Sequence, residues 1–344
     1  MNTLLLSDKK NDLKTAAEIL KNGGVVAMPT ETVYGLAADA LNGEAVSKIF
    51  KAKGRPMDNP LIVHISCVDD ISRFNLVKEF PQTARALAER FWPGPLTMIM
   101  KKSDVIPDEV SAGLSTVAIR LPSHETAREL IKESGTVLAA PSANRSGSPS
   151  PTTAQHVKDD LFGLIDAIVD GDSCAVGVES TVITLATDTP RLLRPGLVTV
   201  EQIEEVIGEI EVDNAVLFKL ENTEKAASPG MKYKHYAPKA KVVLLNCEGD
   251  KFAEYVNEQF EKDECVGAIC YDEDIKHIKA KTIPIGKSDD LETQAQMLFS
   301  ALRQVDELGG FSTVYAHCPQ KTGVGMALYN RLIRAASFEV IDVE

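Results

Sequence analysis

The stretch Val25–Leu36, with the sequence VVAMPTETVYGL, decides what the first half of the chain can become. Its opening residues, Val25–Met28, are all apolar, and a short apolar run between turn residues is typical of a buried strand. Gly23-Gly24, directly before the run, is a typical helix end. The run then meets a proline and a small polar segment, Pro29–Gly35. We therefore predict a helix, then a buried strand, then a polar loop.

Two more segments carry polar or charged residues directly after a predicted strand or helix. Lys53-Gly54-Arg55-Pro56 comes about one helix later, where a helix with apolar residues at 45, 46, 49 and 50 ends near its glycine. Pro141–Ser150 (PSANRSGSPS) follows the apolar run Val137–Ala140 far downstream. The first and third segments lead from strands into small hydroxyl-bearing residues, and the second supplies two cations. Together they could hold a polyanion beside a small polar substrate.

Each segment alone has a plainer interpretation. Lys53 and Arg55 by themselves are typical of a solvated helix end, where cations favour the helix dipole. The loop Pro141–Ser150 is equally compatible with a surface connection and with a ligand site at the carboxyl end of a strand. Thr32 could donate to a small carboxylate or hydroxyl, whereas Glu31 would be unfavourable beside phosphates unless it faces an amine.

The N-terminal half mixes strands and helices without strict alternation. Asn11 or Asp12 can cap the first helix, and Thr152 or Thr153 a later one. His64, within an apolar strand, is more typical of a satisfied core histidine than of a ligand. Apolar patterns predict a helix over 81–91 and strands over 61–65, 96–100, 117–121, 137–140, 167–169, 180–183 and 191–193. We expect an α/β domain over residues 1–209, with an open twisted sheet of mixed direction.

The composition changes after this domain. Residues 225–247 contain lysines but no Asp or Glu, and Ser228-Pro229-Gly230 marks the segment as irregular, so we predict an interdomain linker over 210–240. Strands over 242–245, 266–269 and 313–316 then alternate with helices over 252–260, 291–308 and 327–336. This pattern indicates a smaller Rossmann-like α/β domain over 241–344. No Gly-x-Gly-x-x-Gly follows its first strand, so we assign it no dinucleotide, and Gly323-x-Gly325 fits a helix start.

The bulk composition excludes several classes of protein. The 344 residues are 44% hydrophobic and 25% charged, which is an ordinary globular balance. The net charge of −13 argues against a broad nucleic-acid-binding face. No segment approaches the roughly 20 apolar residues of a membrane span, and Leu4–Leu6 is too short for the core of a signal peptide. The six cysteines form no Cys-x-x-Cys pair, so we expect no zinc site and a reducing, cytoplasmic environment.

No Walker loop, kinase signature or Ser-His-Asp signature is evident, so a nucleotide would need an uncommon scaffold. The three segments instead resemble the YrdC-domain family, through PTETVYGL at 29–36, Lys53-x-Arg55-Pro56, and PSAN at 141–144 with Ser146-Gly147. The segments 177–182 (GVESTV) and 193–196 (LRPG) are similar to motifs of the same family. The segment 228–238 (SPGMKYKHYAP) resembles the linker of its longer, two-domain members, so the likeness covers nearly the whole chain.

The resemblance implies a YrdC-like N-terminal domain and the activity of an L-threonylcarbamoyladenylate synthase, a nucleotidyltransferase. Such enzymes join ATP, L-threonine and bicarbonate and release pyrophosphate, with Mg²⁺ accompanying the ATP. The product feeds threonylcarbamoylation of the tRNA adenosine beside the anticodon, which a separate transferase complex performs. The implied partners are these three small molecules and that complex, with at most a weak RNA contact and no membrane.

The resemblance also assigns roles to individual residues. The catalytic pair would be Lys53 and Arg55. The residues on the ATP side would be Arg55, Asn59, Thr116, Ser142, Asn144, Ser150, Arg194, His235 and Tyr236. The residues that hold L-threonine would be Thr32, His64, Arg120, Ala140 and Ser180. His235 and Tyr236 would close over the triphosphate from the linker, and no residue is assigned to a metal.

Two alternatives remain open at this stage. A non-catalytic module that binds a nucleotide or double-stranded RNA would need a basic cleft, which the net charge of −13 disfavours without excluding it. The carbamoyl-transfer proteins of hydrogenase maturation contain a similar domain, but they carry additional zinc-finger cysteines, and this chain has no such clusters.

Overall fold

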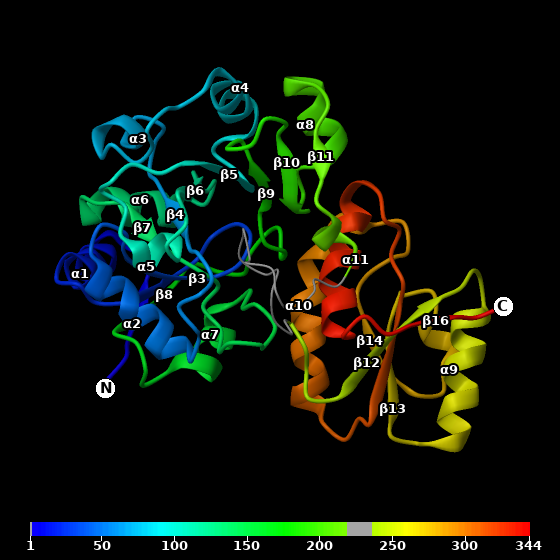
Figure 1. Ribbon diagram of the computed structural model, residues 1–344. Coiled ribbons are helices and arrows are strands. Elements are labelled where there is room, and N and C mark those ends of the chain that lie inside the picture. The colour runs from blue at the N-terminus through cyan, green and yellow to red at the C-terminus, as the bar shows by residue number, and fades with distance from the viewer. Residues whose placement is uncertain (1, 219–235) are drawn as a thin grey trace. The chain divides into compact units, whose positions relative to one another are not determined.

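The chain folds into two units, which we describe separately. The computed structural model describes residues 2–218 and 236–344. Residues 2–146 and 150–218 form the N-terminal unit, and residues 147–149 and 236–344 form the C-terminal unit. Each unit has its own sheet with helices packed on it (Figure 1). Most of the segment expected as a linker, residues 219–235, lies outside the described residues, whereas Glu211–Val212 adds a strand to the N-terminal sheet.

The N-terminal unit is built on one open mixed sheet, as the sequence predicts. Its strands follow the order β1-β8-β2-β3-β7-β4-β6-β5-β9-β10-β11. Strand β2 runs antiparallel to β3, whereas β4 runs parallel to β6. The bounds are β1 Leu4–Ser7, β2 Val26–Met28, β3 Gly35–Asp39, β4 Ile62–His64, β5 Leu96–Lys101, β6 Thr116–Arg120, β7 Leu138–Ala139, β8 Ala167–Asp170, β9 Thr181–Thr184, β10 Arg191–Arg194 and β11 Glu211–Val212.

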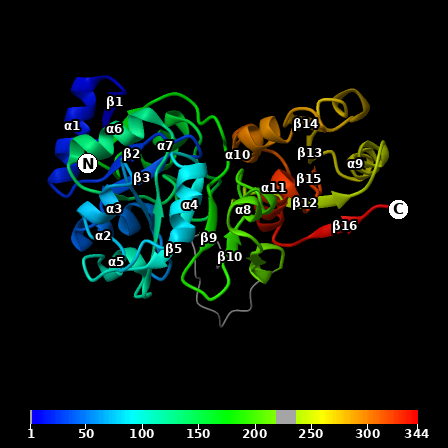
Figure 2. The same ribbon diagram turned by 90° about the horizontal axis from the view of Figure 1, so that it is seen from above.

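The helices of this unit bury apolar faces against the sheet and each other. Helix α1 packs beside α6, and Leu13 and Leu130 share one core cluster (Figure 2). Thr153 caps α7, as the sequence predicts. Neither Asn11 nor Asp12 caps α1, which begins at Lys10. The carboxylate of Asp12 instead accepts hydrogen bonds from Ser7. The bounds are α1 Lys10–Lys21, α2 Gly43–Lys53, α3 Asp70–Arg73, α4 Gln82–Phe91, α5 Asp108–Ser111, α6 Glu125–Ser134, α7 Ala154–Leu161, α8 Val200–Ile207 and η1 Asn214–Val216.

Strand β3 was not predicted, and it changes the meaning of the first polar segment. It pairs antiparallel with β2, with Met28 opposite Gly35 and Val26 opposite Ala37. The sequence GLAAD has low strand propensity, so no pattern marks it as a strand. Its burial between β2 and β7 decides the conformation. The segment 29–34 is therefore the loop of a hairpin, held at both ends.

The C-terminal unit is a parallel sheet between helices, as a Rossmann-like pattern predicts. Helix α9 lies on one face, with α10 and α11 on the other (Figure 1 and Figure 2). The strand order is β14-β13-β15-β12-β16, and the pairs among the described residues are parallel. The bounds are β12 Lys241–Asn246, α9 Lys251–Lys262, β13 Val266–Cys270, η2 Ile275–His277, β14 Lys281–Pro284, α10 Leu291–Leu308, β15 Thr313–His317, α11 Gly323–Ala335 and β16 Val340–Asp342.

The helix over 291–308 is confirmed at both ends, whereas the final helix begins at Gly323, four residues before its predicted start. Strands β14 and β16 were missed, because each is short and has polar residues among its few apolar ones. Within residues 2–218 and 236–344, no helix combines the length and the hydropathy needed to cross a bilayer.

The backbone conformation at the carboxyl end of α2 determines the positions of Lys53 and Arg55. Gly54 has φ 62° and ψ 36°, in the left-handed region, and its N–H donates to the carbonyl of Lys51. The next residue, Arg55, donates its N–H to the carbonyl of Phe50 over 3.0 Å. The helix end is thus closed tightly, and Lys53 and Arg55 leave it in fixed directions.

We expect Gly54→Ala to lower the free energy of unfolding by about 1 to 2 kcal/mol. Nothing lies within 4 Å of the position that a Cβ at residue 54 would occupy, so the cost comes from the backbone conformation alone. Gly135 is in the same situation at the end of α6, and Gly135→Ala should cost a similar amount. Urea denaturation measures both, with the exposed Lys51→Ala as a control expected to change little. An unchanged stability in both glycine variants would contradict this account.

Candidate functional site

The first and third polar segments are hydrogen-bonded to each other. The N–H of Leu36 donates to the carbonyl of Pro141, and the N–H of Ala143 donates to the carbonyl of Tyr34, both over 2.8 Å. A bridge between Gly35 and Ser142 lies between these two bonds. A side chain at residue 35 would meet the Cβ of Ala140 at 3.2 Å, so the glycine permits this close approach. The hairpin loop, residues 29–34, and the loop Pro141–Ser150, which we call the serine-rich loop, are therefore one structural element.

Lys53 joins the second segment to the third. Its ammonium donates to the carbonyl oxygens of Ser142 and Asn144, over 2.5 and 2.6 Å. In return, the N–H of Ser146 donates to the carbonyl of Lys53 over 3.0 Å. The side chain is almost fully buried, and a buried ammonium must find acceptors to offset its lost hydration. The cation thus holds the serine-rich loop against the end of α2.

The serine-rich loop is ordered further by its own side chains. The hydroxyl of Ser142 donates to Oδ1 of Asn144 over 2.5 Å, and the ammonium of Lys53 lies 3.3 Å from the same oxygen. The amide nitrogen of Asn144 donates to the carbonyl of Arg145 over 2.8 Å. The loop, for which the sequence left a surface connection and a ligand site both open, is consequently a constrained one, and Asn144 is buried.

Arg55 and Asn59 lie together beyond the end of α2. The Arg55 guanidinium is half-buried, donates to the carbonyl of Asn59 over 3.2 Å and lies 5.9 Å from the ring centroid of Phe50. The side chain of Asn59 is 1% exposed, and neither its amide nitrogen nor its oxygen forms a hydrogen bond with a residue that the structure describes. A buried amide without partners is costly, so this position suits contact with a polar ligand.

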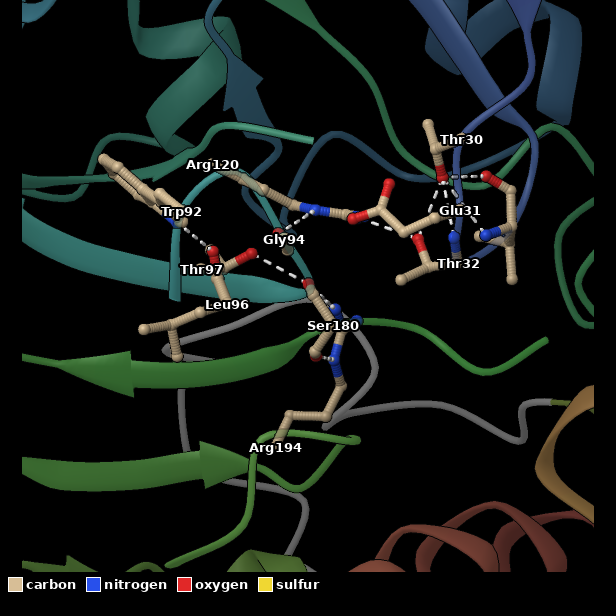
Figure 3. A network of polar contacts seen from close by, with 11 residues as sticks. Thr30, Glu31, Thr32, Trp92, Gly94, Leu96, Thr97, Arg120, Ser180 and Arg194 are labelled. Carbon is tan, nitrogen blue, oxygen red and sulfur yellow. Dashed lines mark hydrogen bonds and ion pairs between the residues drawn. The ribbon is translucent and has the colours of Figure 1, made fainter. Parts of the chain in front are cut away.

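A second group of polar side chains surrounds Arg120, at the end of β6 (Figure 3). One terminal nitrogen of its guanidinium lies 2.7 Å from a carboxylate oxygen of Glu31, and the other donates to the hydroxyl of Thr32 over 2.8 Å. Its Nε donates to the carbonyl of Gly94 over 3.4 Å. Arg120 and Glu31 are both buried, so the structure places a desolvated ion pair inside this site.

The hydroxyl groups beside this ion pair have a fixed direction. The Thr30 hydroxyl donates to the carbonyl of Val33 over 2.6 Å, so in its 2.9 Å contact with Thr32 it accepts. The proton of Thr32 is therefore directed at Thr30, and its oxygen accepts from Arg120. The sequence suggested that Thr32 donates to a substrate; the structure instead leaves this hydroxyl as an acceptor.

The charges in this group follow from its burial. Burial opposes ionisation of Glu31, but the charge and hydrogen bond of Arg120, with the backbone N–H groups of Glu31 and Ser123, hold the pKa of the carboxyl below its usual value. Burial and the charge of Arg120 lower the pKa of His64 to about 3. The Nδ1–H of the neutral imidazole faces the carbonyl of Ile62 over 3.1 Å. Near neutral pH the group therefore holds one cation, one anion and a neutral imidazole.

Ser180 extends this group toward the neighbouring strands. Its hydroxyl lies 2.8 Å from that of Thr97 and accepts from the Arg194 guanidinium over 3.1 Å. Arg194 also donates to the carbonyl of Ser180 over 3.0 Å. Thr97 lies opposite Arg120 in the pairing of β5 with β6. Gly196 allows this packing, because a Cβ there would lie 2.4 Å from the backbone nitrogen of Thr181.

The remaining predicted site residues make contacts of their own, and Ala140 lies beside His64 because both contact the carbonyl of Ile62. The Ser150 hydroxyl donates to a carboxylate oxygen of Glu179 over 2.7 Å, and both residues are buried. Thr116 begins β6, and Ala140 follows β7, where its N–H donates to the carbonyl of Ile62. Tyr236 belongs to the C-terminal unit, where its ring packs against Phe299 with centroids 5.1 Å apart. His235 lies outside the described residues.

Four residues whose side chains join these networks are absent from the predicted site: Thr30, Glu31, Thr97 and Glu179. Glu31 had a signal, because a carboxylate next to Thr32 in a segment with nearby cations calls for a positive partner. Thr97 and Glu179 had none, since each acquires its partner only through strand pairing and loop packing.

The mixed N-terminal sheet, its linked polar loops and the parallel C-terminal sheet define a two-domain α/β protein with a polar site in its first domain. Comparisons with known proteins agree. A family profile described as "Telomere recombination" matches residues 18–196, and one described as "Threonylcarbamoyl-AMP synthase, C-terminal domain" matches residues 198–337. The chain belongs to the YrdC-domain family, among its two-domain members.

Similar curated proteins extend over nearly the whole chain. It is 45% identical to the threonylcarbamoyl-AMP synthase of Pyrococcus abyssi over 338 residues, which cover 96% of each chain. It is 47% identical to the protein of the same name from Bacillus subtilis, over 98% of this chain and 96% of that one. The Schizosaccharomyces pombe protein of that name is 39% identical, over 96% of this chain and 90% of its own.

Solved structures give the same result for the fold. The crystal structure of P. abyssi Sua5 complexed with L-threonine superposes with a TM-score of 0.91 at 42% identity, and the match covers both chains completely. Escherichia coli YciO matches 59% of this chain and all of its own, with a TM-score of 0.52 and 22% identity, which shows similarity of fold alone.

We expect the lowered pKa of His64 to make the fold lose stability below pH 6.5. The unfolded chain binds a proton near pH 6.5, whereas the folded chain does not until about pH 3, so stability falls as pH decreases between these values. Between pH 6.5 and 5 the loss from this group amounts to about 1.5 kcal/mol. Urea denaturation at the two pH values measures it. The His64→Gln variant should lose less stability than the wild type over this interval, and equal losses would contradict the assignment.

Proposed function

We propose that this protein is a threonylcarbamoyl-AMP synthase, which converts ATP, L-threonine and bicarbonate into L-threonylcarbamoyladenylate and pyrophosphate. Full-length similarity carries the proposal: 45% and 47% identity to proteins of that name extend over 96% and 98% of this chain. The geometry supports it, because hydrogen bonds join the three segments that such a site requires. We also propose that the protein acts as a nucleotidyltransferase in the cytoplasm and supplies a tRNA-modifying transferase complex.

The group around Arg120 is suited to hold the amino acid. A guanidinium offers planar paired donors to a carboxylate, which is what the carboxyl group of threonine needs. The amine would react with bicarbonate to give a carbamate and water. Ser180 and the backbone of Ala140 would complete this side of the site. The uncharged imidazole of His64 would line it.

Arg55, directly beyond α2, is suited to contact the phosphates. A carbamate oxygen would attack the α-phosphorus of ATP while the bond to the pyrophosphate oxygen breaks, so AMP is transferred and pyrophosphate leaves. Such a displacement depends on positioning and on stabilising spread negative charge. Arg55 would supply this charge directly. Lys53 would act through the loop that it orders, because its ammonium lies on the carbonyls of Ser142 and Asn144.

Mg²⁺ would enter with the ATP. Among residues 2–218 and 236–344, no group of three or more His, Cys, Asp or Glu could hold a metal ion. The metal would therefore be carried mainly by phosphate oxygens and water, a common arrangement for Mg²⁺ bound to nucleotides. It would neutralise the leaving pyrophosphate, while the residues of the chain orient the α-phosphate.

The direct test is pyrophosphate release by the full chain. With ATP and Mg²⁺ present, we expect release only when both L-threonine and bicarbonate are added, because the carbamate is the nucleophile. Mass spectrometry should detect L-threonylcarbamoyladenylate in the same mixture. Release that is indifferent to threonine would refute the proposed function.

We expect Arg55→Ala to lower turnover by about 10² to 10³-fold, the usual cost of losing one donor to a transition state. The matched control is Arg73→Ala, which removes an exposed arginine whose nearest carboxylate lies 3.9 Å away. The control should retain wild-type turnover in the pyrophosphate assay. Near-normal turnover in Arg55→Ala would remove this residue from the mechanism.

A further inference from the structure

Glu31 is a buried carboxylate at the amino-acid end of the site that the reaction scheme above does not use. Only 7% of the residue is exposed, and it forms its ion pair with the guanidinium that the proposed function assigns to the substrate's carboxylate. A neutral residue here would leave Arg120 as an uncompensated buried charge. Glu31 shares the two terminal nitrogens of Arg120 with Thr32, a residue that the proposed function places on the amino-acid side.

The donors and acceptors at this end of the site determine which ligand groups it can bind. Arg120 supplies donors only, and the Thr32 hydroxyl directs its proton at Thr30, so its oxygen serves as an acceptor. A carboxylate has about four acceptor positions, and neither oxygen of Glu31 accepts a hydrogen bond of ordinary geometry from a described residue, so its contact with Arg120 leaves acceptor capacity for a ligand. Glu31 and Thr32 contact the two terminal nitrogens of one guanidinium, so both acceptors lie side by side. The site thus presents two acceptors next to one cationic fork.

The charges are matched in the same way. Arg120 contributes a positive charge and Glu31 a negative one, and His64 is neutral, so these three residues together carry no net charge. An α-amino acid has the complementary arrangement, with a carboxylate and an ammonium on the same carbon. A hydroxy acid of the same shape has the carboxylate but not the cation.

We propose that Glu31, together with the hydroxyl of Thr32, is the subsite for the α-amino group, and that it selects an amino acid over the corresponding hydroxy acid. The ion pair with Arg120 occupies both charges when no substrate is bound. On binding, the substrate carboxylate takes the Arg120 fork, and Glu31 turns its free acceptor capacity to the substrate nitrogen. This inference rests on the proposed function and names a specificity-determining residue within it.

The arrangement also orients the nitrogen for reaction. Two of its N–H bonds point at Glu31 and Thr32, so once the ammonium has lost its third proton the lone pair points away from both acceptors. Glu31 serves here as an acceptor, and the released proton leaves by another route.

The test is a comparison of two ligands on three forms of the full chain. L-threonine and 2,3-dihydroxybutyrate of the same configuration differ only in whether the α-carbon carries an ammonium or a hydroxyl. Isothermal titration calorimetry should show that the wild type binds threonine more tightly by at least 100-fold. In Glu31→Gln the threonine affinity should fall about 10- to 100-fold, the loss expected for one charge-assisted hydrogen bond. The affinity for the hydroxy acid should stay the same or rise, because Arg120 is then uncompensated.

Asp39→Asn provides the matched control, since it neutralises a partly buried carboxylate at the end of β3. Asp39 accepts from the hydroxyl of Thr136 and the N–H of Leu41 and takes no part in the site, so the ligand preference should be retained. Glu31→Asp keeps the charge and should keep a preference for threonine. If Glu31→Gln does not fold, the wild-type comparison still decides, because equal affinity for the two ligands overturns the proposal.

The outcomes separate this inference from the proposed function. A wild type that releases pyrophosphate with threonine, paired with a Glu31→Gln variant that loses both ligands equally, overturns the inference alone, because Glu31 then only supports Arg120. A wild type that releases no threonine-dependent pyrophosphate refutes the proposed function. Collapse of the preference in Glu31→Gln, with Asp39→Asn unchanged, supports the inference.

Discussion

The burial of the Lys53 ammonium is the constraint on which the rest of the site depends. A cation removed from water requires acceptors, and the structure supplies them from the backbone of the serine-rich loop, more than 85 residues further along the chain. The positive φ of Gly54 directs the chain as it leaves α2 directly after this lysine. Since the same loop is hydrogen-bonded to the hairpin after β2, one side chain couples all three polar segments.

The sequence predicts the larger features of the fold because they depend on periodic patterns. The mixed sheet, the parallel C-terminal sheet and helix 291–308 follow from runs and spacings of apolar residues, which directly determine burial. Strand β3 escapes this reasoning, because Gly35–Asp39 gains its conformation from neighbours that are distant in sequence. The same holds for the short strands β14 and β16, which lie at the two edges of the C-terminal sheet.

For the site, sequence reasoning identified residue types better than it identified contacts. The polar segments and their cations could be predicted, since hydroxyls and charges after buried strands are unusual and specific. Which atom each group would contact could not, because hydrogen-bond direction depends on three-dimensional neighbours. Thr32 became an acceptor through Thr30, Lys53 turned to backbone carbonyls, and Thr97 reached Ser180 only through strand pairing.

The row of hydrogen bonds from Arg120 through Thr32 and Thr30 to the carbonyl of Val33 has a fixed polarity. It starts at a guanidinium that does not release a proton and ends at a carbonyl that does not take one up. Such a row cannot conduct protons, however well aligned its hydroxyls are. A proton that the substrate amine releases therefore cannot leave along this row, so the row holds the site's geometry and takes no part in its proton balance.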